Sequence, residues 1–449
     1  MVLYAAYSPA QVVSPISKSS SSNRTEPRVI AESDHQIPRA EISRNALKVV
    51  QTLNDAGHES YMVGGCVRDL LLSRKPKDFD IATAAEPETV RQLFRNSRVI
   101  GRRFRLVHVR FGREIVEVAT FRASHSSEDD DGAVNVNGRI VRDNVYGTLE
   151  DDAWRRDFSV NSLYYDARDN SIVDHVGGME DMEARRLRLL GCPSTRYRED
   201  PVRLLRAMRF AAKLNFEIDE ASEAPIQELA PLLGEVPGAR LFEECLKLFL
   251  GGDAERSFEM LTRYHIFEEL FPETARYLEV PKAERFVRQA FVNTDLRIAE
   301  GKPVTPGYLF AALLWEPMSR LTEENRQNGM PDFQAIEVAA SDAISTQNER
   351  IAFPRRFSLM AKDIWNLQPR LEQRKGKRAG LLLERPRFRA AYDFLALRCQ
   401  AGEEELEELV DWWTKLQEAN PVDRESALKQ LPPQGSRRRN RRRRKTAEA

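Results

Sequence analysis

A short apolar run, a glycine pair, a helical segment and two aspartates follow one another, and this order constrains the fold more than any other feature. The run is Tyr61-Met62-Val63, the pair is Gly64-Gly65, and the aspartates are Asp78 and Asp80. The pattern predicts a strand, a helix over residues 67–72 and a second strand over residues 78–82. Two such strands around a helix require a sheet that carries helices.

Elements on either side extend this sheet. Ser43 is suited to cap a helix at its N-terminus and Gly57 to end it. A helix behind Pro87 and strands near residues 107–111 and 115–121 complete the arrangement. The first half of the chain is therefore predicted to be an α+β domain, with a mixed sheet and helices on it.

The length requires more than one domain. The chain has 449 residues, whereas single hydrophobic cores rarely grow past about 250. From residue 199 onward almost every periodic segment predicts helix, and the Ser- and Pro-rich start lacks apolar periodicity, which is typical of disorder. We predict a disordered start (1–42), the α+β domain (43–190), helical regions (191–280 and 281–434) and a disordered basic end (435–449).

Composition excludes several classes of protein. No stretch approaches the run of about 20 apolar residues that a membrane span needs. The four cysteines form no CxxC pair, so neither a zinc site nor a disulfide framework is indicated, and a reducing, cytoplasmic location is expected. Basic and acidic residues balance at 69 each. Arginines nevertheless cluster along residues 196–209 and 437–445, and local basic surfaces attract a polyanion.

Asp78 and Asp80 are candidate metal ligands. The two-residue period of a strand places both carboxylates on one face, where they converge on one point. Hard divalent cations such as Mg²⁺ take oxygen ligands, and enzymes that transfer nucleotidyl groups use them to polarise the attacking hydroxyl. The alternative is a solvated pair of aspartates on an exposed face.

The glycine pair is a candidate phosphate holder. Gly64-Gly65 follows a strand and opens a helix, so backbone N–H groups and the positive helix end face a space that glycine leaves open. A tight turn without a ligand is the alternative. Next to the aspartates, however, the pair completes a site for both metal and phosphate.

A third acid is expected, and two residues compete for the role. Glu117 is a charge in an otherwise apolar strand and therefore needs a partner, unless it faces outward on an edge strand. Asp157 follows Arg155 and Arg156, and it either contributes to the site or pairs with these arginines. The sequence does not choose between the two acids.

Residues 198–210 predict one helix with two faces. Arg203, Arg206 and Arg209 lie opposite an apolar stripe. Fixed Asp and Arg side chains on that face would read the edge of a base or a phosphate. The alternative is a solvated face on which Glu199 and Arg203 form an ordinary ion pair four residues apart.

Together these motifs resemble the class II RNA nucleotidyltransferases, which include tRNA CCA-adding enzymes and bacterial poly(A) polymerases. The resemblance covers about residues 42–216. It rests on residues 63–71, on 77–80, on Arg155-Arg156-Asp157-Phe158 with Asn161, and on residues 199–203. It implies a head, neck, body and tail, and attack of an RNA 3′ hydroxyl on the α-phosphate of a nucleotide.

The resemblance also implies residue roles. Asp78 and Asp80 would hold Mg²⁺, with Mn²⁺ as the alternative ion, and Asp200 and Arg203 would act as a protein template for the base. Glu117 and Asp157 remain the candidates for the third catalytic acid, Glu117 as a further metal ligand. The residues implied in ATP binding are Gly64, Gly65, Arg68, Arg155, Arg156, Asp157, Asn161, Asp200, Arg203, Arg206 and Arg209.

Within the family the chain resembles the poly(A) polymerase branch. Residues 95–109, 363–368 and 385–394 carry this likeness, and no His-Asp dipeptide occurs that would mark a phosphohydrolase domain. Cys66 is a departure, because a third glycine or a small residue is expected there. A CCA-adding enzyme is the alternative, and a non-catalytic RNA-binding adaptor would have lost the two aspartates.

The resemblance implies RNA 3′ ends and ATP as partners of a monomer. Proteins of RNA degradation and RNA chaperones are further candidate partners. The basic tail would hold RNA without regard to sequence, through the side chains Arg437, Arg438, Arg439, Arg441, Arg442, Arg443, Arg444 and Lys445.

Deleting residues 436–449 should weaken RNA binding, most strongly at low salt. Each phosphate contact on a single strand contributes roughly 0.7 to the slope of log affinity against log salt concentration. Filter binding at several salt concentrations measures the slope, and chemistry on a bound primer should change little. An unchanged slope would identify the tail as a solvated end.

Overall fold

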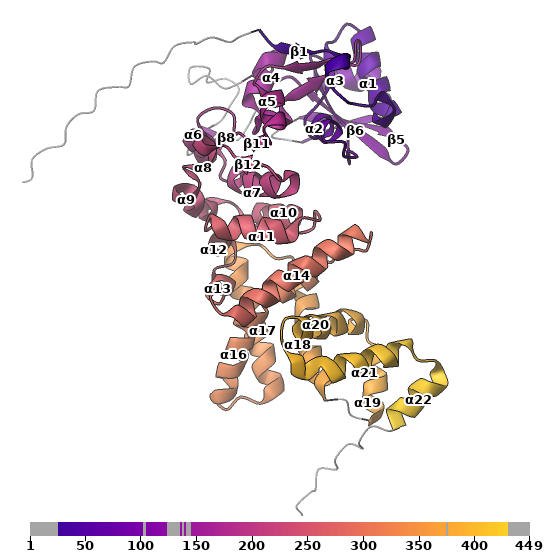
Figure 1. Cartoon of the computed structure of the whole chain (residues 1–449), viewed down its shortest axis with the longest axis vertical. Helices are drawn as coiled ribbons and strands as arrows, with labels where there is room; N and C mark the ends of the chain where they lie inside the picture. The colour runs from indigo at the N-terminus through magenta and orange to yellow at the C-terminus, as the bar shows by residue number, and fades with distance from the viewer. Residues whose placement is uncertain are drawn as a thin grey trace, which may run out of the picture. The chain divides into compact units, whose positions relative to one another are not determined.

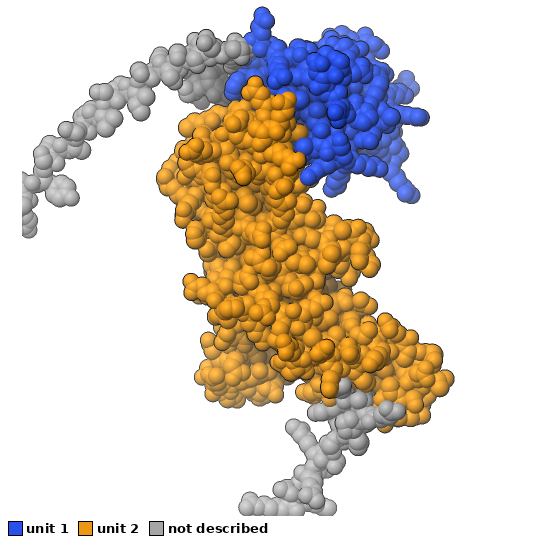
Figure 2. Space-filling model, in the orientation of Figure 1, with its two compact units in different colours: residues 1–124, 146–154, 161–179 blue, residues 125–145, 155–160, 180–449 orange. Residues whose placement is uncertain are grey.

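The computed structural model describes residues 26–101, 105–123, 135–136, 139–140, 145–373 and 376–429. The chain forms two compact units, coloured blue and orange in Figure 2. Unit 1 contains the sheet and draws on residues up to 124, 146–154 and 161–179, whereas unit 2 contains residues 125–145, 155–160 and 180 onward. The two are described separately below.

Unit 1 is an α+β domain, as predicted. Its elements, some of which end within the neighbouring unit, are β1 (Arg28–Ile30), the 3₁₀ turns η1 (Glu32–Asp34) and η2 (Arg39–Glu41), α1 (Arg44–Asp55), β2 (Ser60–Val63), α2 (Gly65–Leu71), β3 (Asp80–Thr83), α3 (Pro87–Leu93), β4 (Ser97–Ile100), β5 (Leu106–Phe111), β6 (Glu114–Thr120), α4 (Leu149–Arg155), η3 (Ser159–Asn161), β9 (Leu163–Tyr165), β10 (Ile172–Asp174) and α5 (Gly178–Glu183).

The sheet has eight strands in the order β1-β10-β9-β2-β3-β6-β5-β4. All neighbouring pairs are antiparallel except β3 and β6, which run parallel. Helices α1 and α3 pack against these strands, and Figure 1 shows both helices beside the sheet. Strand β3, which carries Asp80, is central and has β2 and β6 as its neighbours.

Local rules account for helix α1. The Ser43 side chain accepts hydrogen bonds from the backbone N–H groups of Asn45 and Ala46, as expected for an N-cap. Val49, Val50 and Leu53 are fully buried. Gly57 follows the helix with a φ of 83°, a left-handed conformation that glycine adopts without strain.

Two sequence predictions in unit 1 need correction. The strand predicted from residue 78 begins at Asp80, so Asp78 lies just before it. The start of the chain was predicted to be disordered to residue 42, but Arg28–Ile30 form β1 and pair with β10. A three-residue edge strand is too short to show apolar periodicity, so its partner alone reveals it. Residues 1–25 lie outside the described part.

Unit 2 is a succession of helices, as predicted, with four two-residue strands. Its elements are β7 (Asn135–Val136), β8 (Arg139–Ile140), β11 (Arg186–Leu187), α6 (Pro193–Glu199), α7 (Val202–Leu214), β12 (Glu217–Ile218), α8 (Glu220–Glu223), α9 (Ile226–Leu229), η4 (Ala230–Glu235), α10 (Gly238–Phe249), α11 (Ala254–Arg263), α12 (Phe267–Leu270), α13 (Pro272–Ala275), α14 (Pro281–Ala299), α15 (Pro306–Leu313), α16 (Trp315–Gln327), α17 (Asp332–Arg350), α18 (Arg355–Glu372), α19 (Gly376–Leu383), α20 (Phe388–Gln400), η5 (Glu404–Leu406), α21 (Glu407–Glu418) and α22 (Pro421–Lys429).

Aromatic side chains hold successive helices of unit 2 together. Phe249 of α10 stacks on Phe291 of α14 with ring centroids 4.6 Å apart, and Phe310 of α15 stacks on Phe353 at 4.4 Å. Trp365 of α18 is buried and its indole N–H donates to a carbonyl of α15. The residues that resemble the poly(A) polymerase branch thus include core positions of this unit.

The single helix predicted over residues 198–210 is wrong, because α6 ends at Glu199 and α7 begins at Val202. Asp200 between them is extended, with φ −149° and ψ 92°. The residue before a proline is sterically excluded from the helical region, and Pro201 follows Asp200. The break turns Asp200 away from the helical path.

Two further expectations concern the whole described chain. None of its helices is long and apolar enough to cross a membrane. Its four cysteines are free thiols, and none forms a disulfide.

Protonation of His175 should destabilise unit 1 in mild acid. Both ring nitrogens are buried without a hydrogen-bond partner, and burial lowers the pKa of His175 below its usual value. In the unfolded chain the His175 imidazole is protonated as the pH falls below about 6.5, whereas in the folded chain it stays neutral to a lower pH. Stability is therefore fully present above that pH and falls below it.

Urea unfolding of His175→Phe at pH 7 and at pH 5.5 measures this effect. We expect the variant to lose less stability than the parent chain on acidification. His58→Phe is the control, because His58 has no buried unsatisfied ring nitrogen among the described residues. Equal pH dependence in the parent and His175→Phe would contradict the assignment.

Candidate functional site

The turn between β2 and α2 lies beside the strand that carries Asp80. Gly64 has φ 80° and ψ −131°, a conformation open to glycine and strained for other residues. Its neighbour Val63 pairs directly with Asp80 across the β2–β3 ladder. Burial raises the pKa of the Cys66 thiol to about 12, and the nearby Asp80 charge adds to the rise. The thiol therefore stays neutral and serves as a small apolar side chain.

The predicted carboxylates Asp80 and Glu117 are in register. Asp80 pairs with Glu117 across the parallel ladder of β3 and β6, so both side chains leave the same face of the sheet. Asp78 is exposed and makes no hydrogen bond or ion pair to any residue in the described part. Asp78 and Asp80 flank the buried Phe79, but Asp78 lies before β3, so a shared face for the two carboxylates stays a prediction.

Glu117 is not on an edge strand, so the interpretation that it faces outward from an edge strand is wrong. Strand β6 lies between β3 and β5, and Glu117 contacts His108 of β5, with 3.0 Å between Oε1 and Nε2. About half of the Glu117 side chain is exposed. In the described ranges, no three His, Cys, Asp or Glu side chains are grouped closely enough to hold a metal ion by themselves.

Arg68 of α2 is buried and joins two parts of unit 1. Its guanidinium donates to Asp69 Oδ1 and, at 2.5 Å, to Asn161 Oδ1. Arg68 and Asn161 were both predicted to bind ATP, and the structure brings them into direct contact. This contact ties helix α2 to the segment that carries Asn161.

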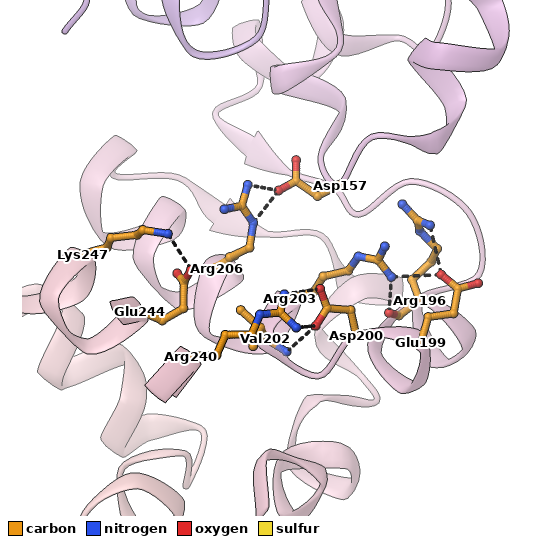
Figure 3. Close-up of polar contacts among 10 residues, drawn as sticks. All are labelled: Asp157, Arg196, Glu199, Asp200, Val202, Arg203, Arg206, Arg240, Glu244 and Lys247. Atoms are coloured by element: carbon orange, nitrogen blue, oxygen red, sulfur yellow. Dashed lines mark hydrogen bonds and ion pairs between the residues drawn. The ribbon is translucent and has the colours of Figure 1, made fainter. Parts of the chain in front are cut away.

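Asp157 lies in unit 2, where it binds Arg206 of α7 (Figure 3). The guanidinium donates two hydrogen bonds to Asp157 Oδ2, at 2.8 Å and 2.5 Å. The Asp157 charge is the main reason that the pKa of Arg206 is raised. The sequence offered Arg155 and Arg156 as the arginines that pair with Asp157. The structure adds Arg206 of α7 as a partner.

Asp200 is held by a residue that the sequence did not point to. Arg240, near the start of α10, donates to both carboxylate oxygens of Asp200 at 2.8 Å and 2.7 Å, as Figure 3 shows. Such a two-point pair fixes orientation as well as charge. No motif marks Arg240, because its partner is 40 residues away in the sequence.

Arg203 forms the ion pair with Glu199 that was one of the two interpretations of this residue. It donates to Glu199 Oε2 at 3.0 Å and to the Arg196 carbonyl at 2.6 Å. Arg196 donates to the same Glu199 oxygen and to the backbone carbonyls of Arg155 and Arg156. The arginines therefore tie the α6–α7 break to the segment that holds Asp157.

Arg206 and Arg209 share the ring of Phe210. Their guanidinium carbons lie 5.3 Å and 4.3 Å from its centroid, distances at which cations are attracted to an aromatic face. Glu244 of α10 contributes a further negative charge near Arg206, and Lys247 donates to it. The predicted tail residues 437–445 lie outside the described residues.

Three family patterns match the chain. They are the Poly A polymerase head domain at residues 60–188, the "Probable RNA and SrmB- binding site of polymerase A" at residues 215–278, and the polymerase A arginine-rich C-terminus at residues 328–446. Together they span most of both units.

Individual proteins give the same result. Poly(A) polymerase I of Escherichia coli O157:H7 is 48% identical over 433 residues, covering 94% of this chain and 93% of that protein. The Salmonella typhimurium enzyme is 47% identical over 411 residues, which cover 90% of this chain and 88% of that protein. A CCA-adding enzyme of Lactobacillus helveticus is 37% identical over 225 residues, half of this chain and 54% of that protein.

The structure of a Bacillus stearothermophilus CCA-adding enzyme in complex with CTP is similar in fold. Its TM-score is 0.52 at 24% identity, and 85% of this chain and 80% of that chain are covered. The likeness shows that this chain shares its fold with that CCA-adding enzyme. With nearly half of its residues identical over almost its whole length, the chain belongs to the bacterial poly(A) polymerase I family.

Removing the Arg206 guanidinium should destabilise unit 2. Arg206→Ala deletes two charge-assisted hydrogen bonds to Asp157, whose side chain is only 14% exposed, and bonds to charged groups contribute about 1.5–3 kcal/mol. Arg198→Ala is the control, because the Arg198–Glu228 pair is largely exposed and such pairs contribute about 0–1 kcal/mol. Denaturant unfolding should separate the two variants, and equal losses would contradict this account.

Proposed function

We propose that the chain adds AMP from ATP to RNA 3′ ends without a template. The RNA 3′ oxygen bonds to the α-phosphorus, the bond to the β-phosphate oxygen breaks, and pyrophosphate leaves while the hydroxyl proton passes to solvent or base. The observation that carries this proposal is the identity to poly(A) polymerase I proteins across 94% of the chain.

Asp78 and Asp80 are proposed to hold a divalent cation, Mg²⁺ or Mn²⁺. The donor set fits, since Asp78 is an exposed carboxylate without a protein partner in the described part and lies two residues before Asp80, the first residue of β3. When bound, such an ion neutralises charge on the phosphates and favours ionisation of the attacking hydroxyl.

Glu117 and Asp157 are the candidates for the third acid. Glu117 is supported by its register with Asp80, and Asp157 by its place next to the arginine segment and its pair with Arg206. Separate Glu117→Gln and Asp157→Asn variants distinguish them, since both changes keep the shape and remove the charge.

The nucleotide is proposed to bind through backbone N–H groups and arginines. The turn at Gly64 and Gly65 would approach the triphosphate, and Asp200 with Arg203 would read the base edge. The other proposed contacts are Arg68, Arg155, Arg156, Asp157, Asn161, Arg206 and Arg209.

A fixed base-reading pair favours one base over another. Arg240 holds both oxygens of Asp200, and Glu199 holds Arg203. A polar pocket with set donors rejects a base that leaves them unpaired in a closed site. This supports selection of a single base, whereas the alternative function, CCA addition, requires acceptance of CTP and then ATP.

We also propose that the chain acts as a monomer in the cytoplasm. Its four free cysteines suit a reducing compartment. Its proposed domains are the head at 43–190, the neck at 191–280 and the body at 281–434, and RNA-degradation proteins or RNA chaperones are proposed as partners.

Purified protein with an unstructured RNA and one nucleotide at a time tests the function. We expect long adenylate tails from ATP and sparse addition from CTP. Asp78→Ala and Asp80→Ala should abolish addition while RNA binding and circular dichroism stay unchanged, and Asp55→Ala, an exposed aspartate of unit 1, should keep full activity. Addition that stops after C, C and A on tRNA, with generic RNA untouched, would instead establish CCA addition.

A further inference from the structure

A hollow of about 450 Å³ lies between α14 and α20 in unit 2. These helices are in contact, and Figure 1 shows them next to each other. The volume falls in the range of about 300–1,000 Å³ that is usual for small-ligand sites. Leu296, Pro303, Met360 and Ala396 contribute apolar surface, so the hollow has room and lining for a planar group.

The polar groups of this hollow are only partly committed. Asp393 accepts from Arg389 at 2.9 Å and lies 3.9 Å from Arg297, and burial raises the pKa of its carboxyl. The Tyr308 side chain lines the hollow, and its hydroxyl makes no hydrogen bond within the described residues. Arg387 at the rim is exposed and pairs with no described acid.

A second hollow, of about 440 Å³, adjoins the first. Both are lined by Pro386 and Arg387, so the loop before α20 separates them. Phe333 of α17 lines the second hollow and is 57% exposed, which is unusual for a phenylalanine. The Arg370 guanidinium lies 5.9 Å from the Phe333 ring, so an aromatic face stands next to a cation.

The cations around the two hollows outnumber the acids that can neutralise them. Arg370, Arg385 and Arg387 form no ion pair with a described residue. Of the acids lining the hollows, Asp393 binds Arg389 and Glu300 binds Lys302. Glu337 accepts a hydrogen bond from Asn366, whose own Oδ1 is buried without a partner. An amide donor leaves the charge of Glu337 in place, so Glu337 and Asp363 are the two acids that face Arg370, Arg385 and Arg387.

We propose that the two hollows form a binding site for single-stranded RNA. Proteins bind single strands by combining cations along the phosphates with aromatic faces on which bases stack. One base would stack on Phe333, a neighbouring nucleotide would enter the hollow at Tyr308, and Arg387 between them would bind the linking phosphate. The inference rests on the proposed function, because it supplies a hold on the RNA chain within the helical unit.

The paired hollows favour an RNA chain over a free nucleotide. A free nucleotide would occupy one hollow and leave the other cations without a counter-charge, whereas two linked nucleotides occupy both. A protein segment would match the charge of these arginines only if it were acidic. The test therefore includes AMP and an oligonucleotide as separate ligands.

Fluorescence anisotropy with a labelled 20-residue oligoadenylate and the full chain tests the site. We expect Arg387→Glu to weaken binding about tenfold and to lower the salt slope by about 0.7 for each lost phosphate contact. Phe333→Ala should weaken binding about fivefold through lost stacking. Arg320→Glu, an exposed arginine of unit 2 outside both hollows, is the matched control and should stay within about twofold of the parent chain.

Two further measurements separate the outcomes. Tail synthesis by the parent chain reports on the proposed function, and loss of affinity in the variants reports on this site, so each can fail alone. The variants should raise the RNA concentration that gives half of the maximal rate of AMP addition. Unchanged affinity and slope in both Arg387→Glu and Phe333→Ala would overturn the proposal, as would displacement of Phe333-dependent binding by AMP as readily as by oligoadenylate.

Discussion

The register of three neighbouring strands decides where the carboxylates of unit 1 lie. Strand β3 pairs with β2 on one side and with β6 on the other, so Val63, Asp80 and Glu117 form a row across the sheet. A slip of one residue in the register would move Asp80 to the buried face of the sheet and Ile81 to the other face. It would therefore bury a charge and expose an apolar side chain. Burial of Ile81, Val116 and Val118 therefore fixes the acids as well as the core.

In the helical unit, ion pairs position the acidic side chains, whereas in unit 1 the register of the strands positions them. Asp157 and Asp200 each bind an arginine from elsewhere in the unit, and Glu199 binds the nearby Arg196 and Arg203. These pairs keep acids and cations side by side at a partly exposed surface, and they hold the α6–α7 break in one shape. A ligand that brings its own charges meets side chains that are already oriented, which lowers the entropy lost on binding.

The sequence predicted those features that depend on nearby residues. Ser43 capping follows from a serine placed just before a helical run, and the glycine turn from a glycine pair after an apolar strand, and the structure has both. The break at Pro201 was missed although a proline disfavours helical geometry for the residue before it. Arg240 was missed because its partner is distant in sequence, and strand β1 because three residues carry no period. Long-range pairing is the information that a single sequence does not display.

The placement of β2 has a consequence for the order in which the chain becomes complete during synthesis. Its two neighbours are β3, which follows closely, and β9, whose Tyr165 pairs with Met62. Until the ribosome has made the chain past residue 165, one side of β2 is an open edge with unpaired backbone groups, the kind of surface that invites pairing with another chain. Pairing across such a separation is also slow. A nascent or truncated chain that ends before β9 is thus exposed to aggregation at the very strand that leads into the glycine turn.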